Sequence, residues 1–182
     1  MPLSPATERE RLHTRGYEFA GYRRADGLWD IEGRMTDVKT YSFQNRYRGE
    51  VQAGEPLHDM WIRLTLDEDL IVRDIEAATA ASPYAVCPAI TPNFKRMIGE
   101  KVGAGWRGAI RKKLGGVEGC THLVEMLGAM ATVAYQTMYP VLAKKAAENP
   151  KPGKPGLIDS CHAYRSDGEV VKQTWPDFYT GG

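Results

Sequence analysis

The sequence predicts an α+β fold, in which one antiparallel sheet from the N-terminal half packs against helices from the C-terminal half. Two observations favour this class. Residues 60–67 alternate apolar and polar side chains, which is typical of a strand with one buried face. From residue 91 onward the apolar residues follow helical spacing instead. A run of strands followed by a run of helices is the pattern of an α+β domain.

Four stretches are predicted to form the sheet. Residues 16–24 and 28–40 are rich in aromatic and β-branched residues, and the turn Ala25-Asp26-Gly27 between them predicts a hairpin. The alternating strand that begins at Met60 follows. Residues 70–77 contain enough Ile and Val to return as its antiparallel partner.

Three helices are predicted after the sheet. A short one begins at Thr91-Pro92, because Thr can cap a helix and Pro fits its first turn. A second covers residues 106–114 and ends at Gly115-Gly116. The third is long, with one apolar stripe over residues 123–141 and a kink predicted at Pro140.

The length of 182 residues fits one compact domain, residues 1–182. Its core is expected over about residues 10–148. The Pro/Gly stretch 150–156 resembles a linker and separates the long helix from a tail at 157–182.

Composition and charge exclude several classes of function. The 24 Lys and Arg nearly balance the 23 Asp and Glu, and a net charge of +1 is too neutral for an electrostatic search of nucleic acid. The N-terminus lacks the pattern of a secretory signal, and the most apolar window, residues 126–135, is too short to span a bilayer. Three cysteines without a CxxC pair support no disulfide framework. We therefore expect a cytoplasmic protein with no nucleic-acid or membrane partner, and a homo-oligomer is compatible with these features.

Cysteine and histidine are the most informative residues for a functional site. Two of the three cysteines stand within two residues of a histidine, in Cys120-Thr121-His122 and Cys161-His162. Cys120 directly precedes the predicted long helix, where unpaired backbone N–H groups and the helix dipole favour a thiolate. The same field disfavours a charged imidazole, so His122 is expected to be neutral and competent as a metal ligand.

His58 and Cys87 complete a candidate metal site. His58 precedes the strand at Met60, and Cys87 lies in the turn-rich segment between sheet and helices. With Cys120, all three stand at the ends of elements, where side chains can converge. One histidine and two thiolates form a ligand set for zinc or ferrous iron, and an open fourth position would make the site catalytic. We expect His58, Cys87 and Cys120 to bind one divalent transition metal, Zn or Fe.

Each of these residues also has a purely structural interpretation. A free cysteine is often a small buried hydrophobic residue, and His58 is equally compatible with a hydrogen-bonded histidine at a strand end. His122 also fits an exposed first helical turn, and Cys161-His162 fits a tail that only packs. Four acidic residues in or just before the second predicted strand are interpreted as a solvated sheet face: Asp26, Asp30, Glu32 and Asp37.

A set of motifs covers almost the whole chain: Leu12-His13-Thr14-Arg15, residues 24–30, Asp37-Val38-Lys39, residues 56–60, Pro83-Tyr84 with Cys87, residues 119–123 and Cys161-His162-Ala163. Together they resemble the bacterial domain-of-unknown-function family 2889. This resemblance implies the catabolism of plant-derived aromatic compounds in bacteria, including formaldehyde-releasing lyase chemistry on lignin-type dimers.

A second resemblance concerns geometry. The segment Gly54-Glu55-Pro56, the strand from Met60, Cys87 ahead of a helix and Cys120 at the start of the long helix are similar to the U-type iron–sulfur scaffold proteins. In that family a thiol or carboxylate precedes the strand and two thiols follow later. Here His58 stands near the first position and no cysteine is close to it, which favours a single metal ion over a cluster.

The leading functional hypothesis is a metal-dependent lyase that cleaves a C–C bond of a small aromatic substrate, in a retro-aldol sense, and releases formaldehyde. Four residues are candidates for moving the proton: His122, Asp59, His13 and Tyr84. His162 would line the pocket from the tail. The alternatives are a metal-dependent hydrolase with the same ligands, a noncatalytic zinc or iron–sulfur scaffold, and a metal-free binding module.

Overall fold

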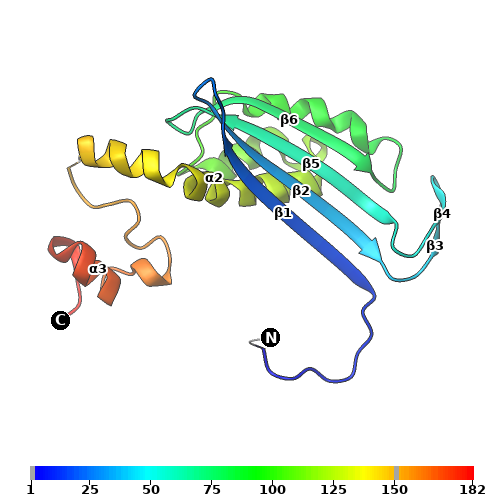
Figure 1. The fold of residues 1–182 in the computed structure, drawn as a ribbon, viewed down its shortest axis with the longest axis horizontal. Helices are drawn as coiled ribbons and strands as arrows, with labels where there is room; N and C mark the ends of the chain where they lie inside the picture. The colour runs from blue at the N-terminus through cyan, green and yellow to red at the C-terminus, as the bar shows by residue number, and fades with distance from the viewer. Residues whose placement is uncertain (1–2, 150–151) are drawn as a thin grey trace. The chain divides into compact units, whose positions relative to one another are not determined.

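The computed structural model describes residues 3–149 and 152–182 (Figure 1). The chain divides into two compact units, Met1–Leu142 and Ala143–Gly182. Pro150 and Lys151, the first residues of the predicted linker at 150–156, lie outside the described residues. Within the described ranges, no helix combines the length and the apolar character that a membrane crossing requires.

The first unit contains a four-stranded antiparallel sheet with the strand order β1-β2-β5-β6. Its strands are β1 (His13–Arg23), β2 (Trp29–Lys39), β5 (Pro56–Leu66) and β6 (Val72–Ala81). All four strands predicted from the sequence are present, with ends that differ by a few residues, and β1 and β2 form the predicted hairpin. The α+β class is therefore confirmed.

A second, two-stranded sheet is not predicted by the sequence pattern. Its strands, β3 (Phe43–Asn45) and β4 (Gly49–Val51), are three residues long, which is too short for an alternation to be recognised. The side-chain oxygen of Asn45 accepts hydrogen bonds from the backbone N–H groups of Tyr47 and Arg48 and so stabilises the turn between these strands.

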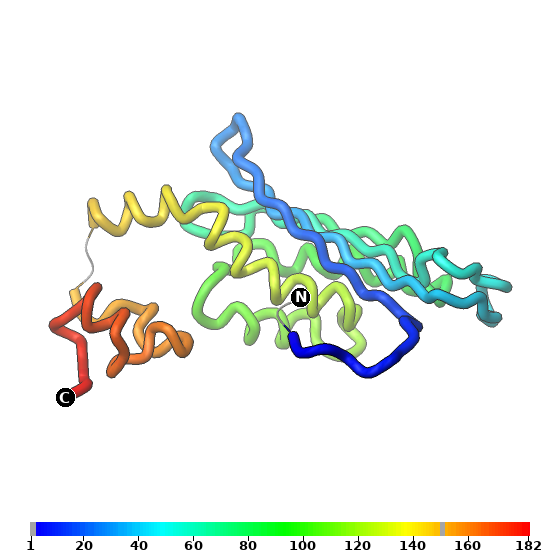
Figure 2. The backbone as a smooth tube through the Cα atoms, turned by 60° about the horizontal axis from the view of Figure 1, so that its bottom comes forward, coloured from blue at the N-terminus to red at the C-terminus, as the bar shows by residue number. Residues whose placement is uncertain are grey.

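The two faces of the large sheet differ in polarity. One face carries the buried apolar residues that pack against the helices: Trp29, Ile31, Met35, Met60, Ile62, Leu64 and Ile75. Figure 2 shows the helical segments of the first unit on one side of the sheet. The opposite face carries ion pairs between neighbouring strands, such as Arg63 with Glu32 at 2.7 Å, and the exposed Trp61. This is the division that alternating side chains impose on an antiparallel sheet.

The helical segments follow the sheet in the order expected. The short helix predicted from Thr91 is instead part of a 3-10 helix, η1 (Cys87–Met97), which begins four residues earlier. Pro92, inside this segment, lacks the N–H group that a regular α-helix needs there, which favours this irregular form. Helix α1 (Trp106–Leu114) has the predicted bounds, and η2 (Gly116–Glu118) follows it.

Helix α2 (Thr121–Glu148) packs closely against β1 and β2. The helix continues through Pro140. It buries the predicted apolar stripe, and its buried residues are Leu123, Met126, Leu127, Met130, Ala134 and Met138. Two glycines on the strands permit this approach. A Cβ atom at Gly21 would lie 1.9 Å from Thr137 Oγ1, and one at Gly33 would lie 3.2 Å from Met126 Sδ. Glycine at these positions therefore sets the short distance between helix and sheet.

The second unit is folded by local contacts. Beyond the end of α2 it contains η3 (His162–Tyr164), α3 (Glu169–Thr174) and η4 (Pro176–Phe178). Ile158 and Val171 are buried, and the rings of Tyr164 and Trp175 lie 5.9 Å apart. The tail predicted at 157–182 thus has defined secondary structure.

We expect Gly21→Ala to destabilise the protein, because its Cβ would overlap the side chain of Thr137. The expected loss in the free energy of unfolding is about 1–3 kcal/mol, the usual cost of overpacking. Chemical denaturation measures this loss. The matched control is Gly108→Ala in α1, where a Cβ meets no atom within 4 Å and should stabilise the helix by about 0.5–1 kcal/mol. Equal stability of both variants would contradict the close contact.

Candidate metal centre

Arg15, Asp37 and His58 form a row across β1, β2 and β5. The strand register pairs Arg15 with Asp37, and Asp37 with His58, so the three side chains share the face that the helices cover. The register shifts directly after Asp37, because Val38 pairs with Pro56 and skips one residue of β5. The row therefore lies at a β-bulge, where β2 is about to end and β5 has just begun.

Asp37 is 2% exposed, and both of its carboxylate oxygens are hydrogen-bonded. Oδ1 lies 2.7 Å from Nε2 of His13 and accepts a bond from Nε of Arg15 at 2.8 Å. Oδ2 accepts a bond from Nη2 of Arg15 at 2.7 Å and lies 2.9 Å from Nδ1 of His58. These four contacts match the number of lone-pair sites that a carboxylate offers.

The partners of Asp37 keep it ionised. Burial raises the pKa of its carboxyl group, but the hydrogen bonds from Arg15 and His13 and the nearby positive charge outweigh burial and hold the pKa at about 2. The bidentate geometry of Arg15 explains why this residue contributes most to the lowering. Asp37 is therefore a fixed negative charge at neutral pH.

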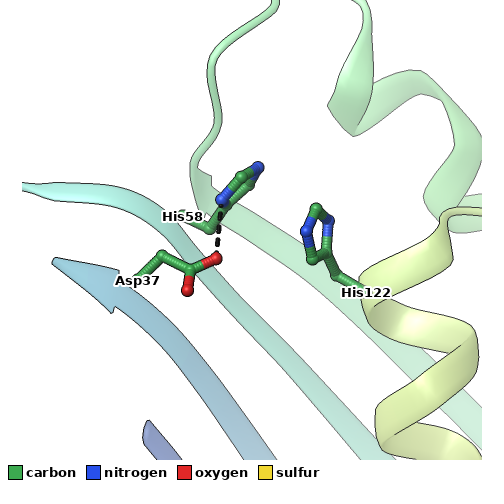
Figure 3. A group of neighbouring side chains, drawn as sticks. All are labelled: Asp37, His58 and His122. Atoms are coloured by element: carbon green, nitrogen blue, oxygen red, sulfur yellow. Dashed lines mark hydrogen bonds and ion pairs between the residues drawn. The ribbon is translucent and has the colours of Figure 1, made fainter. Parts of the chain in front are cut away.

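His122 reaches this row from the first turn of α2 (Figure 3). Its ring lies against that of His58, with 4.1 Å between ring centroids and 42° between planes. The Nδ1 atom of His122 lies 3.9 Å from Sγ of Cys120. Cys120 also caps the helix, because its carbonyl oxygen accepts the hydrogen bond from Val124 N.

Both histidines are expected to be neutral at pH 7. Burial lowers the pKa of His58, and the neighbouring His122 lowers it further against the opposing effect of Asp37. Burial also lowers the pKa of His122, with a further contribution from the charge of Arg15. Neutral imidazoles can bind a metal ion without first losing a proton.

Asp37, His58 and His122 could together hold a metal ion. One ligand atom from each residue lies within 4.8 Å of the other two. Two imidazoles and one carboxylate are a ligand set for zinc or ferrous iron, so the group is compatible with the metal expected from the sequence.

The metal-ligand group differs from the set predicted from the sequence, which is His58, Cys87 and Cys120. Of these, the structure places His58 in the group and Cys120 beside it. Cys87 is partly exposed at the start of η1. Across residues 3–149 and 152–182, the group of potential ligands contains no cysteine.

The predicted proton carriers are separated by the fold. His122 belongs to the group, and His13 contacts it through Asp37. Asp59 follows His58 in β5 and therefore points to the opposite face of the sheet, where it pairs with Arg34 at 2.8 Å.

Tyr84 precedes η1 in the first unit, whereas His162 belongs to the second unit. The ring of Tyr84 is exposed and contacts Tyr47 edge-on, with 5.3 Å between the centroids. His162 belongs to η3 of the second unit, next to the exposed Cys161. Among the described residues, Tyr84 does not belong to the metal-ligand group.

The interpretation of Asp37 as part of a solvated acidic face is wrong. Asp30 and Glu32 occupy even positions of β2, whereas Asp37 has the same parity as the buried Ile31 and Met35. Residues of equal parity in a strand share one face. Parity is therefore the signal in the sequence that identifies Asp37 as an inward-facing carboxylate.

We expect Arg15→Met to destabilise the metal-free protein by about 1.5–3 kcal/mol at pH 7, because the buried Asp37 loses two charge-assisted hydrogen bonds. The folded-state pKa of Asp37, about 2, lies below its usual value, so its stabilising effect is present at neutral pH and is lost as the pH falls. The difference from the unmodified protein should thus shrink between about pH 4 and about pH 2.

Denaturation in the presence of a chelator, over a series of pH values, measures this difference. Arg24→Met is the matched control, because Arg24 pairs with Asp26 in an exposed turn and its loss should change stability little. A pH-independent loss in Arg15→Met would show that packing, not the charge of Asp37, is responsible.

Comparisons with known proteins agree with one of the two resemblances. No curated protein and no solved structure gives a significant match, so the similarity to U-type iron–sulfur scaffold proteins gains no support. A family model described as a protein of unknown function, DUF2889, matches residues 13–136. The matched range contains Asp37, His58 and His122 together with His13, Arg15 and Cys120. The chain belongs to the DUF2889 family.

Proposed function

We propose that this protein is a metal-dependent enzyme for a small-molecule substrate, with one divalent transition metal, zinc or iron, bound by Asp37, His58 and His122. The observation that carries the proposal is the convergence of two neutral imidazoles and an ionised carboxylate from β2, β5 and α2. Three protein ligands leave a coordination position open for water or substrate, whereas structural zinc sites use four.

The spacing of Asp37 and His58 supports a shared ion. Two ligand atoms bound about 2.0–2.2 Å from one ion lie about 3 Å apart when they occupy adjacent coordination positions. Oδ2 of Asp37 and Nδ1 of His58 are 2.9 Å apart. The ion would replace the proton that lies between these two atoms. The neutral imidazole of His58 can carry its proton on Nε2 instead.

Arg15 and His13 would act as outer partners of this ion. Both contact Asp37, and such contacts to a ligating carboxylate fix its orientation. Arg15 also reaches Glu125 of α2, with 3.6 Å between Nη1 and Oε2, and Glu125 accepts a hydrogen bond from Tyr17 OH at 2.9 Å. These contacts would keep helix and sheet in register around the ion.

A bound divalent ion lowers the pKa of a neighbouring hydroxyl group or water and stabilises negative charge on oxygen. We assign acceptance of the proton to His13, whose side chain is 46% exposed and contacts Asp37. This chemistry suits a lyase that breaks a C–C bond in a small aromatic substrate and releases formaldehyde, the activity implied by the family resemblance. A hydrolase would use the same residues with water.

A metal-free acid–base enzyme is the second candidate. The buried contact between Asp37 and His58 also forms a carboxylate–histidine pair, which orients an imidazole as a general base without an ion. The two candidates differ in whether the protein holds a metal, which a direct measurement decides.

We expect about one zinc or iron ion per chain in protein purified without an affinity tag, measured by elemental analysis. His122→Ala and Asp37→Ala should each lower the metal affinity by at least about tenfold, because each removes a ligand. Cys87→Ser should keep the metal, since Cys87 stands outside the group.

His162→Ala is the matched histidine control, because it removes an imidazole from the second unit. It should leave the metal content unchanged. Metal-free wild-type protein that also binds no added Zn²⁺ or Fe²⁺ would refute the proposal and favour the acid–base candidate. Loss of metal in Cys87→Ser would instead support the ligand set predicted from the sequence.

A further inference from the structure

Lys39 lies at the end of β2 and shares a face of the sheet with the metal ligand Asp37. The register of β1 and β2 is continuous here and pairs Lys39 with His13, one step beyond the pair of Arg15 and Asp37. Lys39 and Asp37 are two residues apart in β2, so their side chains project to the same side. The ammonium group therefore belongs to the end of the sheet that carries the candidate metal centre.

The contacts of Lys39 hold its charge in place without neutralising it. Its Nζ atom lies 4.3 Å from the ring centroid of Phe43 and 5.0 Å from that of Tyr41. It also donates a hydrogen bond to Tyr41 OH at 3.1 Å. No carboxylate among residues 3–149 and 152–182 forms an ion pair with Lys39 in the structure. An ammonium group has three donors, so donors remain for an external acceptor.

The charges around the candidate centre indicate what that acceptor is. Asp37 and Glu125 supply two negative charges, and Arg15 and Lys39 supply two positive charges. These two negative and two positive charges balance one another. A divalent ion would then leave two positive charges uncompensated at a site with an open coordination position.

We propose that Lys39 binds an anionic group of the substrate, so that the substrate is a small organic anion that carries a carboxylate or phosphate in addition to the oxygen that meets the ion. This inference rests on the proposed function, because the ion supplies the second point of attachment. The aromatic rings of Tyr41 and Phe43 would pre-position the ammonium group and lower the cost of ordering it on binding.

The test uses the full chain loaded with Co²⁺, whose visible absorption reports ligand binding. Three probes are titrated: succinate, its monomethyl ester and 3-phosphonopropionate. Wild type should bind succinate at least about tenfold more tightly than the ester, as expected for one charge-assisted contact. In Lys39→Gln this preference should fall to near unity, while Lys39→Arg should retain most of it. Tighter binding of the phosphonate than of succinate would identify a phosphate-bearing substrate, and the reverse a carboxylate.

Lys112→Gln is the matched control, because this exposed lysine lies in α1, and it should behave as wild type. Equal preference in wild type and Lys39→Gln would overturn the inference, and so would a wild type that does not distinguish the dianions from the ester. A marked loss of Co²⁺ affinity or of folded structure in both Lys39 variants would also overturn it, by showing a structural role. Failure of wild type to bind Co²⁺ would instead refute the metal centre itself.

Discussion

The buried carboxylate of Asp37 is the constraint on which the rest of the site depends. Removing an ionised carboxylate from water is costly unless charged and hydrogen-bonding partners replace the lost solvation. Here the replacement comes from both neighbouring strands, with Arg15 and His13 on β1 and His58 on β5. The positions of these four side chains are consequently coupled, because a partner that turns away removes a hydrogen bond from a buried charge.

This constraint acts together with the packing of α2. The apolar stripe of the helix determines which side faces the sheet, and the glycines at positions 21 and 33 let the helix approach β1 and β2 closely. His122 directly precedes Leu123, where the buried stripe begins, and its ring lies against that of His58. The apolar interior therefore positions a polar cluster that contributes little to the core itself.

The sequence predicts helices and strands well where the apolar periodicity is strong, and poorly where an element is too short to show a period. Helix α1 is found with its observed bounds because an apolar stripe ends at two glycines, whereas the three-residue strands β3 and β4 carry no periodic signal. His58 and His122 are singled out because histidine is rare in this chain. Asp37 is missed because acidic residues are common on sheet surfaces, and its parity decides its orientation only once the strand is fixed. Convergence of Cys87 with His58 cannot be judged from positions at element ends, since ends of elements occur on every side of a domain.

The contact between His58 and His122 joins two layers of the first unit, because one residue lies on the sheet and the other on α2. A ligand that binds both layers binds only the state in which they are docked, and it stabilises that state by mass action. At a free concentration one hundred times its dissociation constant, such a ligand adds about 2.7 kcal/mol to the stability of the docked form. Binding at this site and docking of α2 on the sheet are therefore thermodynamically linked. An ion bound there would stabilise the contact between helix and sheet in addition to any role in catalysis.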